Sequence, residues 1–257
     1  MPFKLQFIAF QTIFFREIKR FMRIWVQTLL PPIITMGLYF AIFGKLMGNR
    51  IGDMAGVPYI QFVIPGLIMM SIITNSFSNV VSSFYSAKFQ KSIEELLVSP
   101  VPNYLILSGY VAGGVARGLS VGFFVTVVSL LFADLTIQNF GLTILVVLLT
   151  SILFSILGFM NALYANSFDD IAVIPTFVLT PLIYLGGVFY STDLLPGVWR
   201  TISELNPIIY IVNAFRAGVL GQSDINIELS LGVVFLCCVA ATILCLHLLK
   251  KGKGLRQ

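Results

Sequence analysis

Few residues of this sequence can do chemistry, because charged residues are scarce: there are 16 Lys and Arg and 11 Asp and Glu among 257 residues. One group of them occurs in the segment KFQKSIEELLVS, where Lys91 and Glu95 stand one helical turn apart and Pro100 and Pro102 follow. This composition favours a short helix that ends before the prolines. Its charges suit contact with water, as part of a solvated loop, or contact with a partner protein.

The groups needed for catalysis are missing from the sequence. No GxxxxGK[ST] phosphate loop, HExxH motif or Ser–His–Asp set can be assembled. The single histidine, His247, ends an apolar run, where snorkelling to the membrane interface is expected rather than proton relay. Cys237, Cys238 and Cys245 lie in the same run without other metal-binding residues at ligand spacing, so we predict packing roles for them. We therefore expect no enzyme activity, no metal and no cofactor on this chain.

Long stretches without charge indicate a membrane protein. Hydrophobic residues make up 58% of the chain and charged residues only 11%, and about 20 apolar residues in a helix cross the hydrocarbon core. Helices rather than barrel strands are expected, because backbone polar groups in lipid must be satisfied internally. The predicted fold class is an all-α membrane protein whose transmembrane domain covers residues 24–257. Six transmembrane helices are predicted near residues 24–45, 60–83, 104–132, 141–164, 171–190 and 229–249.

The basic residues predict the orientation of these helices. Eleven of the sixteen Lys and Arg residues precede the first predicted span, separate the second from the third, or follow the last. By the positive-inside rule both termini are cytoplasmic, and the same distribution argues against nucleic-acid binding. Between the last two spans, residues 194–205 and 207–220 are apolar but too short to cross. They are expected to form short re-entrant or interfacial external helices.

Residues 1–23 are predicted to form an amphipathic interfacial helix. Its apolar residues recur at steps of four and three and so share one face; they are Phe3, Phe7, Phe10, Phe14, Ile18 and Phe21. The opposite face carries Arg16, Lys19, Arg20 and Arg23, which are expected to face anionic headgroups. A simple membrane anchor and a rim for a docked partner both fit this pattern.

Arg117 is the only basic residue well inside a predicted span. A charge at that depth costs about 2.5–3.5 kcal/mol on insertion scales, so the side chain is expected to face protein or water. A structural partner, snorkelling and contact with a transported molecule along a pathway are the open alternatives.

The segment that starts at Leu179, LTPLIYLGGVFYSTDLLPGVWRTISELNPIIYIVNAFR, resembles the signature of ABC-2 type transporter permeases. Its proline and glycine residues also suit packing and turns. Further segments, such as QFVIPGLIMMSIITNSFSNV and NSFDDI, extend the resemblance to the YadH-like bacterial inner-membrane permeases over residues 10–257. The positions that match the signature are Leu182, Leu185, Gly186, Val188, Leu195, Pro196, Pro207, Ile208, Tyr210 and Arg216.

This resemblance implies the membrane-spanning subunit of an ABC transporter in the bacterial inner membrane. The implied assembly is a homodimer with a separate cytoplasmic ABC ATPase, which would hold the ATP and Mg²⁺, and the implied activity is export of an amphiphile, a glycoconjugate or a drug-like compound. Segment 88–102 would be a cytoplasmic coupling helix. The implied contacts with the ATPase are Lys91, Glu94, Glu95 and Leu96, and, in a second segment, Asp169 and Asp170.

Two other functions fit the same composition. An autonomous secondary transporter or channel usually keeps membrane-buried acids for ion coupling, and none lies deep in the predicted spans. A non-transporting membrane scaffold would need no coupling helix.

Overall fold

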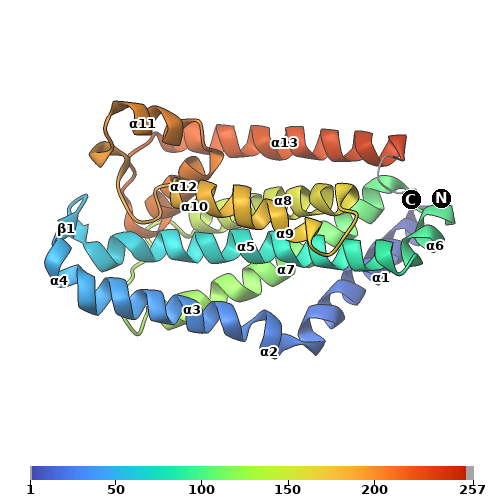
Figure 1. Ribbon diagram of the computed structural model, residues 1–257, viewed down its shortest axis with the longest axis horizontal. Helices are drawn as coiled ribbons and strands as arrows, with labels where there is room; N and C mark the ends of the chain where they lie inside the picture. The colour runs from blue at the N-terminus through green and yellow to red at the C-terminus, as the bar shows by residue number, and fades with distance from the viewer. Residues whose placement is uncertain (1, 253–257) are drawn as a thin grey trace.

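Long helices that run side by side make up the body of the molecule (Figure 1). The computed structural model describes residues 2–252, with the side chains at positions 45, 49, 97 and 193 left aside. In chain order the elements are α1 (Phe3–Arg23), α2 (Trp25–Thr28), α3 (Leu30–Phe40), the π-helical η1 (Ala41–Met47), α4 (Gly48–Ile51), strands β1 (Asp53–Met54) and β2 (Val57–Pro58), α5 (Tyr59–Phe89), α6 (Ser92–Val98), α7 (Asn103–Ser129), α8 (Phe140–Tyr164), α9 (Asp170–Ile174), the π-helical η2 (Pro175–Leu179), α10 (Thr180–Tyr184), the 3₁₀ turn η3 (Thr192–Leu194), α11 (Gly197–Glu204), α12 (Pro207–Leu220) and α13 (Ile227–Lys251).

Five of the six predicted spans correspond to helices long and apolar enough to cross a membrane. Within residues 2–252 these are Trp25–Gly44, Tyr59–Phe89, Asn103–Ser129, Phe140–Tyr164 and Ile227–Lys251. The all-α membrane class predicted from the charge-free runs is therefore confirmed.

The predicted fifth span, 171–190, is wrong in its bounds. The helix formed by α9, η2 and α10 covers only Asp170–Tyr184. It ends because the chain turns at Gly187, whose φ of +73° lies in a region that favours glycine. The neighbouring Gly186 lies so close to Ile208 that a Cβ there would approach the Ile208 Cγ2 to 2.6 Å. The turn thus packs against α12, which begins about twenty residues further along the chain.

The two short segments predicted before the last span are helical in the structure. The first becomes α11, which begins only at Gly197, after Pro196, because proline suits the start of a helix and not its interior. The second becomes α12, whose N-cap Asn206 accepts a hydrogen bond from the Ile208 N–H at 3.0 Å. Both lie at the end of the bundle that also carries β1 and β2 (Figure 1).

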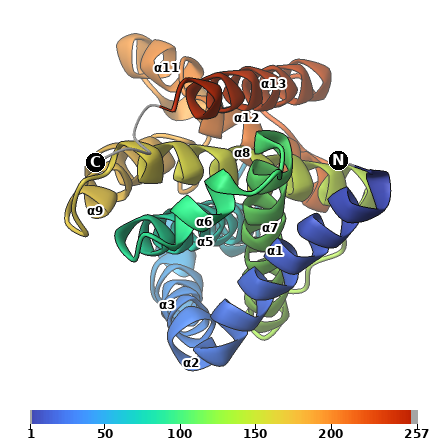
Figure 2. The same ribbon diagram turned by 90° about the vertical axis from the view of Figure 1, so that its right-hand side faces the viewer.

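Helix α5 is the centre of the bundle and the most buried of the five spans. It packs most extensively against α8 and α7, and α1 crosses α7 at one end (Figure 2). Small residues allow these close contacts. At Gly158 of α8, a Cβ would lie 2.5 Å from the backbone oxygen of Phe77 in α5.

This contact predicts opposite effects for two glycine-to-alanine changes. Gly158→Ala is expected to destabilise the protein by about 1–3 kcal/mol, because α5 and α8 must move apart. Gly232→Ala in α13 meets nothing within 4 Å and is expected to stabilise it by about 0.5–1 kcal/mol, because alanine favours a helix interior. Thermal unfolding in detergent measures both. Equal changes in melting temperature for the two variants would contradict the close contact between α5 and α8.

Candidate functional site

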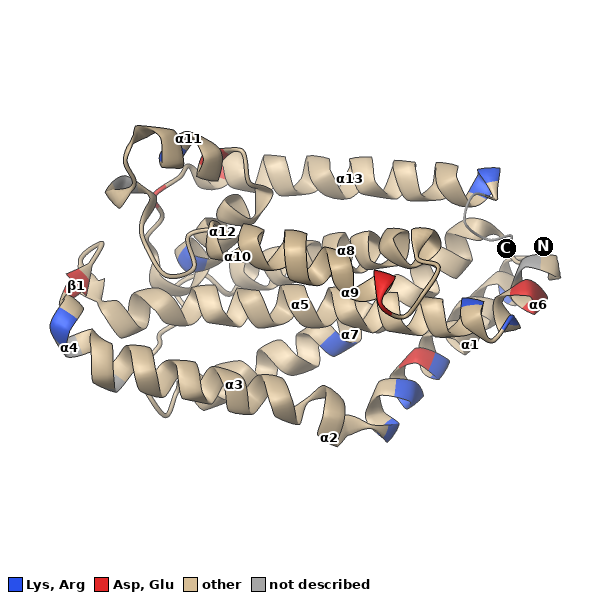
Figure 3. Ribbon diagram, in the orientation of Figure 1, with Lys and Arg blue, Asp and Glu red and all other residues tan. Residues whose placement is uncertain are grey.

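The charged residues gather at the two ends of the bundle (Figure 3). One end carries α1, α6, the turn of residues 165–170 and the C-terminal end of α13, and we call it the α6 end. It brings together the two segments in which the sequence predicted contacts with an ATPase.

Helix α6 is shorter than the helix predicted for this segment. The chain turns between α5 and α6 at Lys91, whose φ is +59°, so Lys88 belongs to the last turn of α5. Lys91, Glu94 and Glu95 are exposed, and among the described residues none of them pairs with an opposite charge. Leu96 is half-buried against the core and Ile93 is 2% exposed. The helix therefore rests on an apolar side and presents acids to solvent.

The second predicted contact segment is built around a reciprocal pair of hydrogen bonds. The Asp170 carboxylate accepts hydrogen bonds from the backbone N–H groups of Asn166 (2.9 Å) and Ser167 (3.2 Å), and the Ser167 hydroxyl accepts one from the Asp170 N–H (3.1 Å). These hydrogen bonds resemble a capping box and close the turn that leads into α9. Asp169 is exposed. The Asp170 carboxylate thus shapes the turn, while Asp169 is the acid left free to meet another molecule.

Lys88 joins the end of α5 to the end of α8, a role that sequence reasoning missed. Its Nζ donates hydrogen bonds to the backbone oxygens of Leu163 (2.9 Å) and Ala165 (2.8 Å). These carbonyls end α8, where a cation is favourable. The side chain is 8% exposed. The only signal in the sequence was a lysine at the end of a very long apolar run.

Lys88→Met is expected to destabilise the protein by about 2–3 kcal/mol, because both carbonyls lose their partner inside the protein. Chemical unfolding in detergent would measure this loss. Lys91→Met, which removes an exposed lysine three residues away, serves as the control and should change stability by less than about 0.5 kcal/mol. If Lys88→Met loses no more stability than Lys91→Met, the hydrogen bonds of Lys88 contribute little to the fold.

A polar network lies behind the α6 end, between α1, α5 and α7. Glu17 of α1 is 1% exposed and lies 3.5 Å from the Arg16 Nη2 and 3.3 Å from the Arg20 Nε. The Arg20 Nη2 also donates to Asn79 of α5, to its backbone oxygen at 2.9 Å and its Oδ1 at 2.8 Å. Arg16 donates to the Tyr110 hydroxyl of α7 at 2.6 Å. The prediction that Arg16 and Arg20 face away toward headgroups is therefore wrong.

Arg117 of α7 continues this network. Its Nη2 donates to the Asn75 Oδ1 at 3.0 Å and reaches the Thr28 backbone oxygen at 3.5 Å. The cation inside the span thus has protein partners on α5 and α2, which is the structural alternative among those left open by the sequence. Whether it also meets a transported molecule stays a prediction.

Part of the predicted signature comes together at the opposite end of the bundle. Arg216 is 1% exposed, its guanidinium carbon lies 3.7 Å from the centre of the Phe62 ring, and its Nη2 donates to the Gly187 oxygen at 2.8 Å. Gly186, Val188 and Ile208 are also buried. These residues fasten the turn after α10 to α5 and α12.

The other signature positions have separate surroundings. Leu182 and Leu185 are half-buried on and just after α10. Leu195 is half-buried and Pro196 exposed, at the start of α11. Pro207 begins α12, and the nearby Tyr210 hydroxyl donates to the Glu204 oxygen at 2.8 Å. The signature therefore describes how the chain turns and packs between α10 and α12, and its members do not form one chemical site.

Comparison with known proteins agrees with this architecture. The model of the ABC-2 type transporter family matches residues 8–220. The chain is 55% identical over 253 residues to the inner membrane transport permease YadH of Escherichia coli (strain K12), covering 98% of this chain and 99% of that one. It is 25% identical over 204 residues to nodulation protein J of Rhizobium meliloti (strain 1021), covering 79% and 77%. The chain therefore belongs to the ABC-2 type transporter family and is a multi-pass inner-membrane permease of an ABC transporter, whose ATPase is a separate chain.

Proposed function

We propose that this permease exports an amphiphile, a glycoconjugate or a drug-like compound as a homodimer, and that two ATPase subunits, which hold the ATP and Mg²⁺, dock on the α6 end. The observation that carries the proposal is the link through Lys88. It ties the end of α5, which leads into α6 with its exposed Glu94 and Glu95, to the end of α8, which leads into the turn that exposes Asp169. A subunit that pushes on either segment therefore pushes on the ends of α5 and α8 together.

The positions of the two chain ends support six crossings, and the basic residues gathered at the α6 end support a cytoplasmic location for it. Helix α1 and the end of α13 both lie there (Figure 1), and two ends on one side require an even number of crossings. Five helices have full length, and we propose that Asp170–Tyr184 supplies the sixth crossing. Its fifteen residues rise about 22 Å at 1.5 Å per residue, and the buried α12 and the turn at Gly187 fill the remaining depth.

An amphiphilic cargo is supported by an apolar pocket of about 520 Å³ between α8, the Asp170–Tyr184 helix, α12 and α13. Its lining includes Leu153, Leu157, Val178, Leu182 and Ala241. Such a lining suits a hydrocarbon chain or another apolar group.

Affinity purification of the chain from its native membrane tests the proposal. A Walker-type ATPase is expected to co-purify at one copy per permease, and vesicles containing both proteins should transport an amphiphile only with ATP and without vanadate. Solute transport by the permease alone would instead favour an autonomous transporter and contradict the proposal.

A further inference from the structure

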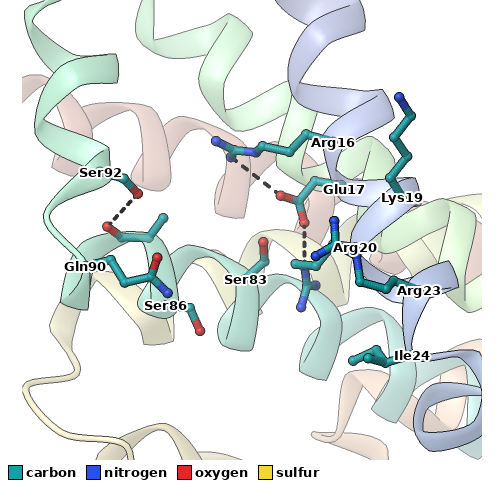
Figure 4. A pocket seen from close by; sticks show the side chains of 11 residues that line it. Arg16, Glu17, Lys19, Arg20, Arg23, Ile24, Ser83, Ser86, Gln90 and Ser92 are labelled. Carbon is teal, nitrogen blue, oxygen red and sulfur yellow. Dashed lines mark hydrogen bonds and ion pairs between the residues drawn. The ribbon is translucent and has the colours of Figure 1, made fainter.

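The α6 end holds a pocket of its own, separate from the apolar pocket between α8 and α13. The pocket at the α6 end has a volume of about 470 Å³ and lies between α1, the end of α5 and the start of α6 (Figure 4). Its polar lining includes Arg16, Lys19, Arg20, Arg23, Ser83 and Ser86.

The charges in this pocket are unbalanced. Glu17 is the one carboxylate among its lining residues, and it already lies within 3.5 Å of both Arg16 and Arg20. Lys19 and Arg23 are exposed and have no ion pair or hydrogen bond with any described residue. Two cations are thus left to attract an anion from outside the protein.

The α5 side of the pocket supplies a hydroxyl group. Ser83 is only 5% exposed, and its Oγ has no hydrogen-bond partner in the described part of the chain. Figure 4 shows this hydroxyl directed toward α1 and its arginines. Because Ser83 lines the pocket, its hydroxyl is free to donate to an acceptor that enters from outside.

The pocket lies at the depth of the membrane interface, and this depth indicates which anion it binds. Its lining includes Ile24, just before the first span, and Gln90, just after α5, so the pocket opens where the helices leave the hydrocarbon. Guanidinium, ammonium and hydroxyl donors together suit phosphate oxygens. Anionic phospholipids present such groups at this depth.

We propose that the pocket between α1, α5 and α6 binds the phosphate of one anionic phospholipid headgroup, with Lys19 and Arg23 supplying charge and Ser83 a hydrogen bond. The site borders α6 through Ser92, so an occupied site would steady the start of the helix that the ATPase is proposed to contact. The lipid site itself depends neither on the cargo nor on the ATPase.

Native mass spectrometry of the purified chain tests the site without nucleotide or cargo, so its failure is distinct from failure of the proposed function. The chain is reconstituted in phosphatidylcholine with graded phosphatidylglycerol, then released and weighed. Wild type should retain one phosphatidylglycerol. Lys19→Gln with Arg23→Gln should weaken retention roughly 30-fold, and the charge-neutral Ser83→Ala about fivefold.

Lys250→Gln with Lys251→Gln is the matched control, because it removes two exposed basic residues at the same end but outside the pocket. It should leave retention unchanged. Three results would contradict the site and indicate diffuse electrostatic attraction instead: an equal loss of phosphatidylglycerol in the control, no loss with Ser83→Ala, or equal retention of phosphatidylcholine. Displacement of the lipid by millimolar inorganic phosphate would support the phosphate site but assign it to a soluble phosphate.

Discussion

Reversing two charges in α6, by Glu94→Lys with Glu95→Lys, is expected to detach the ATPase from the permease. Both carboxylates are exposed and have no partner within the described chain, so they are free to meet basic groups on the ATPase. Placing like charges against each other costs several kcal/mol at an interface. Two reversals should therefore lower the affinity by at least about 100-fold.

The amount of ATPase that remains on the purified permease measures this effect. The matched control is Glu204→Lys with Glu228→Lys, which reverses two exposed acids at the opposite end of the bundle. The control should keep its ATPase, and both double variants should unfold within about 1 kcal/mol of wild type because all four side chains are exposed. Retention of the ATPase by the α6 variant would remove α6 from the docking surface.

The sequence predicted best those features that depend on local composition. A run of about 20 residues without charge is sufficient to recognise a span, and five spans were found close to their true positions. The predicted span ended too early, at residue 83, six residues before the end of α5 at Phe89, so Lys88 fell outside it. In the structure, Lys88 donates hydrogen bonds to backbone oxygens 75 and 77 residues further along the chain. No local sequence pattern reveals such distant partners.

The same limit explains the error in α1. A helical wheel sorts residues by type and assumes that cations face water or headgroups. Here Gly113 lets α7 approach α1 so closely that a Cβ there would lie 2.5 Å from the Cβ of Glu17. This approach buries the acid and draws Arg16 and Arg20 inward. The signature around Arg216 was recognised as a pattern, but its physical role, a cation stacked on Phe62, appears only in three dimensions.

Glu17→Gln is expected to destabilise the protein about as much as Lys88→Met. It leaves Arg16 and Arg20 without their carboxylate, and breaking a buried ion pair from one side costs about 3–5 kcal/mol. Arg16 and Arg20 are 47% and 31% exposed, so water screens part of the repulsion and about 2–3 kcal/mol is expected.

The chain contains its own control for this experiment. Glu204 also pairs with an arginine in a helix, with 2.9 Å between its Oε1 and the Arg200 Nε, but both side chains are about half exposed, at 46% and 51%. Glu204→Gln should therefore change the free energy of unfolding by only about 0.3–0.5 kcal/mol. Denaturant unfolding of the two variants compares the same chemical change in a buried and an exposed pair. If the free energy of unfolding falls equally little in both variants, the network does not hold α1 to α5 and α7. The apolar contacts of Ile13 and Phe21 must then do so instead.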